Sequence, residues 1–277
     1  MTEAMNTILQ PISNSTATGG TFPRGHNILA VASGKGGVGK TWFSISLTTA
    51  LARQGKKVLL FDGDLGLANV DVQLGLMPKR DLNDVIRGRL SLDKVVQRYE
   101  DGGFDIIAGR SGQAALSALP TQRLIMLRDQ LIDLSHEYDA VVIDLGAGID
   151  RTVRMMSASA TRTLLVTTDE PTSLTDAYAF IKLGSAAGMS KAVSIVVNQA
   201  QNTLEGEKTY KTLLKACENF LRLSPPLAGM IRHDPKVKEC IRHQTPLLVR
   251  SPNSEAAVDI ERIARNVDET LRKMAVA

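Results

Sequence analysis

The chain has 277 residues, of which 43% are hydrophobic and 22% are charged, and its formal net charge at pH 7 is +4. These values predict a soluble globular protein with a substantial core, in one large α/β domain or two small ones. No apolar run approaches the roughly 20 residues needed to cross a bilayer. The first residues lack the basic cluster and apolar core of a secretory signal, so we expect a cytoplasmic protein with reduced cysteines.

Residues 1–26 are rich in Asn, Ser, Thr, Gly and Pro and predict a mobile tail. After the tail, apolar runs alternate with amphipathic helical patterns. The predicted strands are 28–32, 57–62, 104–108, 139–144, 163–167, 193–198 and 227–231. The predicted helices are one carrying Ile45, Leu47, Ala50 and Leu51, then 67–74, 82–87, one from 92, 121–136, 151–159, 174–186, 207–221, one after 234, and a long final helix. This alternation predicts a single doubly wound α/β domain, residues 27–277, whose mostly parallel sheet has helices on both faces.

The loop after the first predicted strand is glycine-rich: residues 34–41 read Gly-Lys-Gly-Gly-Val-Gly-Lys-Thr. Strand, glycine turn and helix form the context in which G-x-x-x-x-G-K-[ST] is a phosphate-binding loop (P-loop). The loop N–H groups and the helix dipole would face one anion. Lys40 would reach the β- and γ-phosphates, and Thr41 would offer its hydroxyl to Mg²⁺. The predicted nucleotide-contacting residues here are Gly36, Gly37, Val38, Gly39, Lys40, Thr41 and Trp42, with core packing as the alternative role of Trp42.

Two later strands end in an aspartate, Asp62 and Asp144. In a parallel sheet the carboxyl ends of the strands meet at one edge, where ligands of such folds bind. We therefore expect both carboxylates to converge on the glycine-rich loop.

A second lysine, Lys35, stands early in the loop, and the resulting Lys-Gly-Gly-Val-Gly-Lys-Thr resembles the deviant phosphate loop of the ParA/MinD ATPases. The resemblance covers residues 27–250. It implies a P-loop NTPase fold, ATP and Mg²⁺ as cofactors, and an ATP-bound homodimer that sandwiches two nucleotides. Lys35 would cross the interface to the ATP of the other chain, whereas a solvated loop lysine is the alternative. Together with Lys40 and Asp64, Lys35 makes up the implied catalytic set.

The same resemblance assigns roles to the acids and to a glycine near the phosphates. Asp64 matches the residue that orients or deprotonates the attacking water, with helix capping as the alternative. Asp62 matches the residue that supports the magnesium shell, and Asp144 would hold a magnesium-bound water. Gly148 would bring its amide to the γ-phosphate, although Leu145-Gly146 replaces the usual pair before it and predicts a looser switch.

The resemblance also implies that three positions contact the adenine base or the ribose. Asn198 matches an asparagine that reads the adenine edge. Arg232 stands where the family usually has proline, so either a backbone carbonyl there contacts the base or the arginine stacks on it. Glu170 matches an acid at the dimer interface near the ribose of the other subunit's nucleotide.

Residues 64–71, 74–88 and 169–182 look like the flagellar-number regulators of the FleN/FlhG type. That likeness implies a nucleotide-switched dimer that restrains a flagellar transcriptional activator or a flagellar-assembly GTPase. One alternative is a MinD/ParA-type positioning or DNA-segregation ATPase that acts on membrane or nonspecific DNA. Another is a metabolic or cluster-carrier ATPase, which normally has a C-x-x-C pair that this sequence lacks.

Two surface features bear on these alternatives. From Lys208 to Arg250, nine Lys/Arg stand against three acids, which leaves open a contact with DNA, anionic lipid or an acidic protein. The final helix is amphipathic but of mixed charge and without Trp or Phe, so we expect it to dock on the domain or a partner. Recruitment to the membrane or cell pole stays open. The spacing of Cys217, His233, Cys240 and His243 matches no common zinc site.

Overall fold

The structure, a computed structural model, describes residues 25–109, 119–186 and 193–276, with the backbone alone from 273. Most of the predicted tail therefore lies outside the described residues. Gly25 already belongs to the folded domain, because its N–H donates to the Ser159 carbonyl at 3.1 Å.

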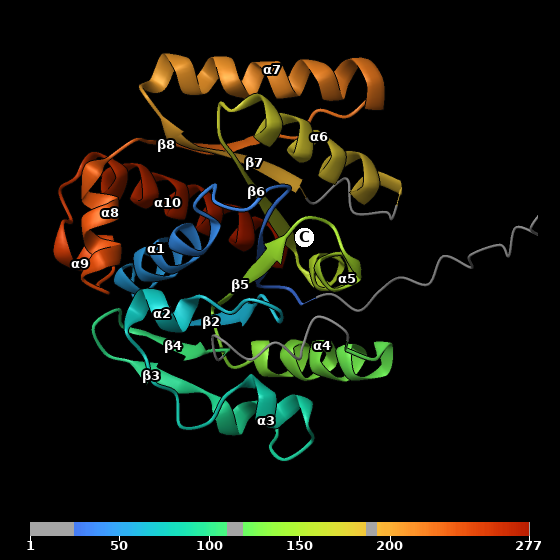
Figure 1. Cartoon of the computed structure of the whole chain (residues 1–277), viewed down its shortest axis with the longest axis vertical. Helices are drawn as coiled ribbons and strands as arrows, with labels where there is room; N and C mark the ends of the chain where they lie inside the picture. The colour runs from blue at the N-terminus through green and yellow to red at the C-terminus, as the bar shows by residue number, and fades with distance from the viewer. Residues whose placement is uncertain (1–24, 110–118, 187–192, 277) are drawn as a thin grey trace, which may run out of the picture.

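Eight described strands form one sheet in the order β3-β4-β2-β5-β1-β6-β7-β8 (Figure 1). The strands are β1 Ile28–Ser33, β2 Val58–Gly63, β3 Gln97–Tyr99, β4 Phe104–Ile107, β5 Ala140–Ala147, β6 Arg162–Thr167, β7 Val193–Ala200 and β8 Leu227–Arg232. Every pairing is parallel except that of β3 with β4. The chain leaves β1 in one direction toward β2 and later returns to β6 on the other side. The loop after β1 therefore lies at the switch point where ligands bind in such sheets.

Helices cover both faces of the sheet, as the sequence predicts (Figure 1). They are α1 Lys40–Arg53, α2 Val70–Leu74, α3 Leu82–Ile86, the 3₁₀ helix η1 Leu92–Val95, α4 Thr121–Ser135, α5 Arg151–Ser159, α6 Pro171–Ala186, α7 Thr203–Leu221, α8 Pro235–Arg242, α9 Leu247–Arg250 and α10 Glu255–Val276. Side chains of a strand alternate between the faces. In β1, Ile28 and Ala30 join the core under α3 to α7, whereas Leu29 and Val31 join the core under α1, α2 and α8 to α10.

Several element boundaries differ from the prediction for local reasons. Helix α2 begins at Val70 rather than near residue 67, because the Asp64 carboxylate accepts the Leu67 N–H and holds residues 65–69 in a loop. Helix α7 begins earlier than expected, at Thr203, because Asn202 caps it. The sequence analysis missed β3 and α9, which have three and four residues and therefore too little periodicity to recognise.

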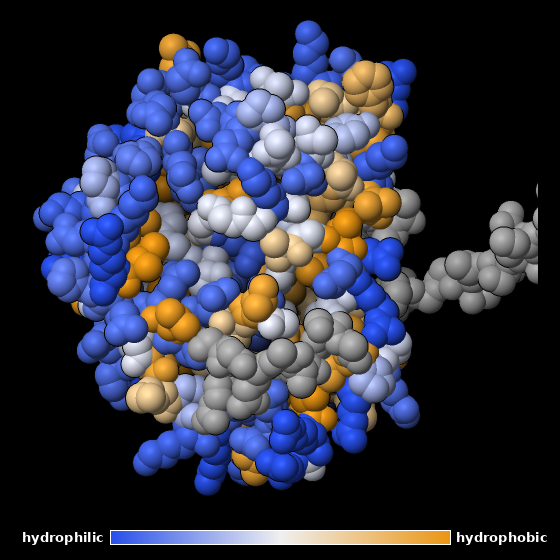
Figure 2. Space-filling view, in the orientation of Figure 1, coloured by the Kyte–Doolittle hydropathy of each residue, from blue (hydrophilic) through white to orange (hydrophobic). Residues whose placement is uncertain are grey.

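Helix α10 docks on the domain, as expected of its charge pattern. Its buried apolar residues are Ala256, Ala257, Ile260, Ile263, Ala264, Val267 and Leu271. They pack against α1 and β8, and Lys56 of the α1–β2 connection pairs with Asp268 at 3.0 Å. The view in Figure 2 is mostly hydrophilic with small separate hydrophobic areas. Among the described helices, none has the length and apolar character needed to span a bilayer.

Candidate nucleotide-binding site

The loop after β1 is held open by its glycines and fixed at its start. Gly37 and Gly39 have φ values of 82° and 90°, which side-chain-bearing residues rarely adopt. The Ser33 hydroxyl donates to the Lys35 carbonyl at 2.9 Å. Gly34 lies so close to α6 that an added Cβ would be 2.4 Å from the Asp176 carbonyl. In contrast, a Cβ on Gly36 would meet nothing within 4 Å. The loop therefore has a rigid entry and an open middle, which is the shape that a bound phosphate requires.

Asp144 of β5 contacts three polar side chains at the start of α1. Thr41 Oγ1 donates to Asp144 Oδ2 at 2.6 Å and Ser44 Oγ donates to Asp144 Oδ1 at 2.9 Å. The Lys40 ammonium lies 3.4 Å from the same Oδ1. The structure thus brings together Lys40, Thr41 and Asp144 as predicted. The sequence analysis did not select Ser44, although its position one helical turn after Lys40 and Thr41 could have indicated it.

Asp62 lies beside Asp144, because β2 and β5 are parallel neighbours that pair these two residues. Its side chain is buried, and from the described residues it accepts two long backbone hydrogen bonds, both of 3.3 Å, from Asp64 and Val70. Burial, reinforced by the charge of Asp144, raises the pKa of Asp62 to about 8. Burial also raises the pKa of Asp144, against the opposing effect of Lys40 and the two hydroxyls. Two buried carboxylates this close are costly without a cation.

These donors fit Mg²⁺. Thr41, Asp62 and Asp144 offer hydroxyl and carboxylate oxygens, the ligands that Mg²⁺ takes, usually together with waters and substrate phosphates. No cluster of three or more His, Cys, Asp and Glu side chains suited to a metal occurs within the described residues. Cys217 and Cys240 belong to hydrophobic cores on opposite faces of the sheet, so the structure keeps these two cysteines apart.

Asp64 and Gly148 directly follow β2 and β5, which are neighbouring strands of the sheet. Asp64 Oδ1 accepts the Leu67 N–H at 2.9 Å, and a Cβ on Gly146 would be 3.4 Å from the same oxygen. The Asp64 carboxylate therefore lies directly beside Gly146 of β5. Gly148 has a φ of 92° and donates its N–H to the Ser33 carbonyl at 2.9 Å. Its amide would have to leave that carbonyl before it could bind a γ-phosphate.

Lys35 points to α6 of its own chain. Its ammonium lies 2.6 Å from Glu170 Oε2 and 2.9 Å from Thr172 Oγ1. The structure thus brings together two residues to which the resemblance assigns contacts across a dimer interface. Thr172 was not selected from the sequence.

The residues predicted on the base side have partners within the chain. Asn198 is buried and donates from Nδ2 to the Val38 carbonyl at 2.8 Å, so it supports the phosphate loop directly. The Arg232 guanidinium binds Asp259 and Glu255 of α10 at 2.9 and 2.6 Å. That engagement favours the alternative in which backbone near Arg232, rather than its side chain, contacts a base. Trp42 is buried in the core under α1, in keeping with its packing alternative.

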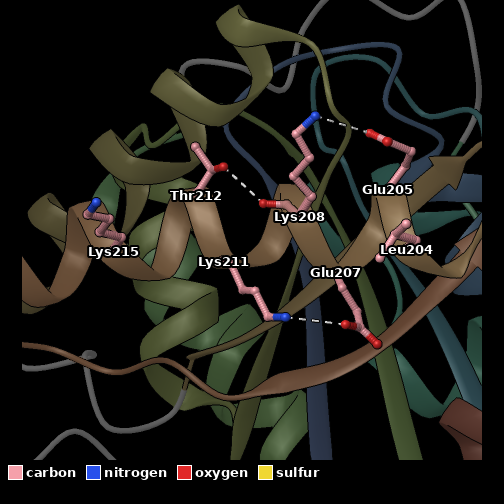
Figure 3. Close-up of a pocket in the computed structure, with 7 residues that line it drawn as sticks. All are labelled: Leu204, Glu205, Glu207, Lys208, Lys211, Thr212 and Lys215. Atoms are coloured by element: carbon pink, nitrogen blue, oxygen red, sulfur yellow. Dashed lines mark hydrogen bonds and ion pairs between the residues drawn. The ribbon is translucent and has the colours of Figure 1, made fainter.

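The basic stretch from Lys208 is less basic in space than along the chain. On α7, Lys208 pairs with Glu205 at 3.7 Å and Lys211 with Glu207 at 3.3 Å (Figure 3). Glu205 and Glu207 precede Lys208, so the count of charges from Lys208 to Arg250 did not include them. These four residues line a surface pocket along α7, together with Lys215. Lys215 has no ion pair with any described residue. The exposed charge of this face is therefore partly balanced.

A glycine-rich loop at the switch point of a parallel sheet, followed by a lysine and a threonine that meet a β-strand aspartate, defines a P-loop nucleotide-binding protein. Residues 29–247 match the family model of the CobQ/CobB/MinD/ParA nucleotide-binding domain, and the chain belongs to that family. The resemblance to ParA/MinD ATPases is thereby confirmed.

Named relatives agree with this assignment. The chain is 39% identical over 241 residues to the antiactivator FleN of Pseudomonas aeruginosa, covering 87% of this chain and 86% of FleN. It is 32% identical to the flagellum site-determining protein YlxH of Helicobacter pylori, covering 85% and 80% of the two chains. The cell-division ATPase MinD of Pyrococcus furiosus superposes with a TM-score of 0.75 at 25% identity, covering 88% of this chain and 99% of that one. MinD of Pyrococcus horikoshii, solved with Mg-ADP, gives 0.74 at 25% identity, covering 91% and 99%.

Proposed function

We propose that the protein is an ATP-dependent, dimerising regulatory ATPase that controls flagellar number by binding a flagellar transcriptional activator or an assembly GTPase. The observation that carries the nucleotide part is the convergence of Lys40, Thr41 and Asp144 beneath an open glycine loop. The likeness to an antiactivator and to a flagellum site-determining protein supports the flagellar part.

Each residue in this proposal has a distinct task. The loop N–H groups and Lys40 hold the β- and γ-phosphates, and Thr41, Asp62 and Asp144 face the magnesium position. Bound Mg²⁺ would neutralise charge that develops on the transferred phosphoryl group. Asp64 lies at the edge of the site and has a second carboxylate oxygen with which to orient a water. Dimerisation would add Lys35 of the other subunit and complete the positive charge around the phosphates.

The test is sedimentation velocity of the full chain with ATP and Mg²⁺, followed by phosphate release. We expect a monomer without nucleotide, a dimer with ATP, and return to monomer as ATP is hydrolysed. Calorimetry that gives no ATP-binding heat with folded protein would refute the proposal at its first step. Affinity capture with an ATP-locked dimer, followed by identification of the bound proteins, then tests whether a flagellar activator or assembly GTPase is among them.

The second candidate, a positioning or segregation ATPase, makes a different prediction. Such a protein would bind random DNA with a steep inverse dependence on salt, or anionic vesicles through α10. The ion pairs on α7 and the burial of α10 favour the regulator. Strong salt-sensitive retention on random DNA would favour segregation instead.

A further inference from the structure

Two side chains that the proposed dimer needs are bound to each other in the single chain. The Lys35 ammonium lies 2.6 Å from Glu170 Oε2 and 2.9 Å from Thr172 Oγ1, so two of its three donors are used. The side chains of Lys35 and Glu170 are 38% and 61% exposed, so water and a second subunit can reach both. While this contact persists, neither residue is available to a partner chain.

The lysine side of the contact is fixed at its backbone. The hydroxyl of Ser33, which is fully buried, donates to the Lys35 carbonyl at 2.9 Å. The preceding residue, Gly34, lies against the Asp176 carbonyl without room for a Cβ. The loop entry therefore cannot slide along α6, and Lys35 can leave the contact by side-chain rotation alone.

The acceptor side is equally rigid. Ser173, which stands between Thr172 and the following turn of α6, is buried, and its hydroxyl contacts Thr167 Oγ1 at 2.9 Å and the Thr168 N–H at 3.1 Å. These two bonds attach the start of α6 to the end of β6. The Glu170 carbonyl accepts the Leu174 N–H at 3.1 Å and so belongs to the first helical turn. Because the backbone is fixed on both the lysine side and the acceptor side, forming the contact costs little conformational entropy.

We propose that Lys35, Glu170 and Thr172 form a latch in cis, which keeps Lys35 on its own chain until a second, ATP-loaded copy of this chain offers it a phosphate. The inference rests on the proposed function and adds a regulation of its dimerisation step. An exposed ion pair is worth about two- to fivefold in an equilibrium constant. Each dimer breaks two latches, so their combined effect on dimerisation is the square of that factor. A phosphate at a desolvated interface is a stronger acceptor than an exposed carboxylate, so the exchange favours the dimer only when ATP is present.

Thr172 provides the variant that tests the latch, because it is outside the predicted nucleotide site. Thr172→Val removes one acceptor with little change in shape. Thr175→Val is the matched control: Thr175 lies one turn further along α6, is exposed, and donates its hydroxyl to the Pro171 carbonyl instead of contacting Lys35.

The first measurement uses nucleotide-free protein and follows acylation of individual lysines by peptide mass spectrometry. The Lys35 nitrogen must leave Glu170 and Thr172 before it can react, so the contact should slow its acylation by about two- to fivefold relative to Lys215. Thr172→Val should raise the rate at Lys35 by about twofold, and Thr175→Val should not change it. Equal rates at Lys35 in the wild type and both variants would overturn the latch.

The second measurement is dimerisation with a non-hydrolysable ATP analogue and Mg²⁺, by sedimentation at several protein concentrations. Thr172→Val should form half its dimer at about two- to tenfold lower concentration than the wild type, with Thr175→Val unchanged. Wild-type dimerisation in Thr172→Val overturns the regulatory role. If no form dimerises, the proposed function fails, and acylation alone then decides whether the latch exists.

Discussion

The pair of buried carboxylates predicts how stability should depend on pH in the absence of metal and nucleotide. Asp62 has a folded pKa of about 8, against 3.8 for the unfolded group, chiefly because it is buried and secondly because Asp144 is adjacent. The folded protein therefore holds a proton that the unfolded chain has lost between about pH 4 and pH 8. The resulting stability is fully present below pH 4 and is lost as the pH rises through 8.

The size of this effect follows from the difference of about four pKa units, which corresponds to about 5 kcal/mol at the upper limit. Asp62→Asn should remove most of it. The amide keeps an oxygen to accept the N–H of Asp64 or Val70 and gains an NH₂ that can donate to Asp144. We expect this variant to be more stable than the wild type by about 2–5 kcal/mol at pH 8 and by only about 1–2 kcal/mol at pH 5, because pH 5 is little more than one unit above the unfolded pKa.

Urea unfolding from pH 5 to 8.5 with a chelator and without nucleotide measures the effect. The comparison is the slope of unfolding free energy against pH in Asp62→Asn and in the wild type. Asp139→Asn, at an exposed position whose carboxylate accepts the Lys57 N–H, is the control for loss of one acid. Parallel pH profiles for Asp62→Asn and the wild type would refute the argument that Asp62 is forced to hold a proton.

Three further predictions concern the glycine-rich loop and the residues proposed to act in catalysis. Asp64→Ala should slow phosphate release by about 100-fold or more and accumulate the ATP-bound dimer, whereas a wild-type rate would contradict its role in orienting water. Lys40→Ala should lose ATP binding in calorimetry, while Lys35→Ala should keep ATP binding and lose dimerisation. Indistinguishable binding defects would count against a contact in trans. Gly34→Ala should lower stability in thermal unfolding by about 1–3 kcal/mol, because its Cβ would overlap the Asp176 carbonyl, whereas Gly36→Ala should unfold at the wild-type temperature.

The sequence predicts the fold and the phosphate side of the site because both depend on local patterns. Fully buried parallel strands appear as apolar runs, and Asp62 and Asp144 converge because each lies near the carboxyl end of such a run. Ser44 could have been added by helical spacing, since it lies on the same face of α1 as Lys40. For these residues, a correct assignment of strand, loop and helix is enough to place the side chain.

The contacts of Lys35 and Arg232 could not be predicted in the same way. Lys35 meets Glu170 from 135 positions away, and Arg232 meets Asp259 from 27 away, and no periodicity relates the members of either pair. Each contact joins elements that are separate in the sequence and become neighbours only when the domain has folded. The count of basic residues along the chain overstates the unpaired charge on α7 for a related reason, because charge balance depends on which side chains are neighbours in space.

The packing of α10 favours docking on the domain over binding to a membrane. Ile263 packs directly over β8, where a Cβ on Gly229 would lie 2.4 Å from Ile263 Cγ1. On the same side, buried Asp259 accepts hydrogen bonds from the Arg232 backbone N–H at 3.0 Å and from its guanidinium. Helix α10 therefore supports the strand that carries the predicted base-side segment.

Undocking α10 from the domain would expose Ile260, Ile263, Val267 and Leu271, all buried, to water unless the helix then inserted into a bilayer. At about 1.5–3 kcal/mol for each side chain, the cost is about 6–12 kcal/mol, comparable with the whole stability of an ordinary domain. Ile263→Ala should therefore lower the unfolding free energy by about 2–4 kcal/mol, whereas Val258→Ala, at an exposed position of the same helix, should change it by less than about 0.5 kcal/mol. Sedimentation with anionic vesicles should leave the wild type in solution. If the wild type binds vesicles, and Ile263→Ala weakens that binding without lowering stability, then α10 is a membrane helix and its docking on β8 is not what holds it.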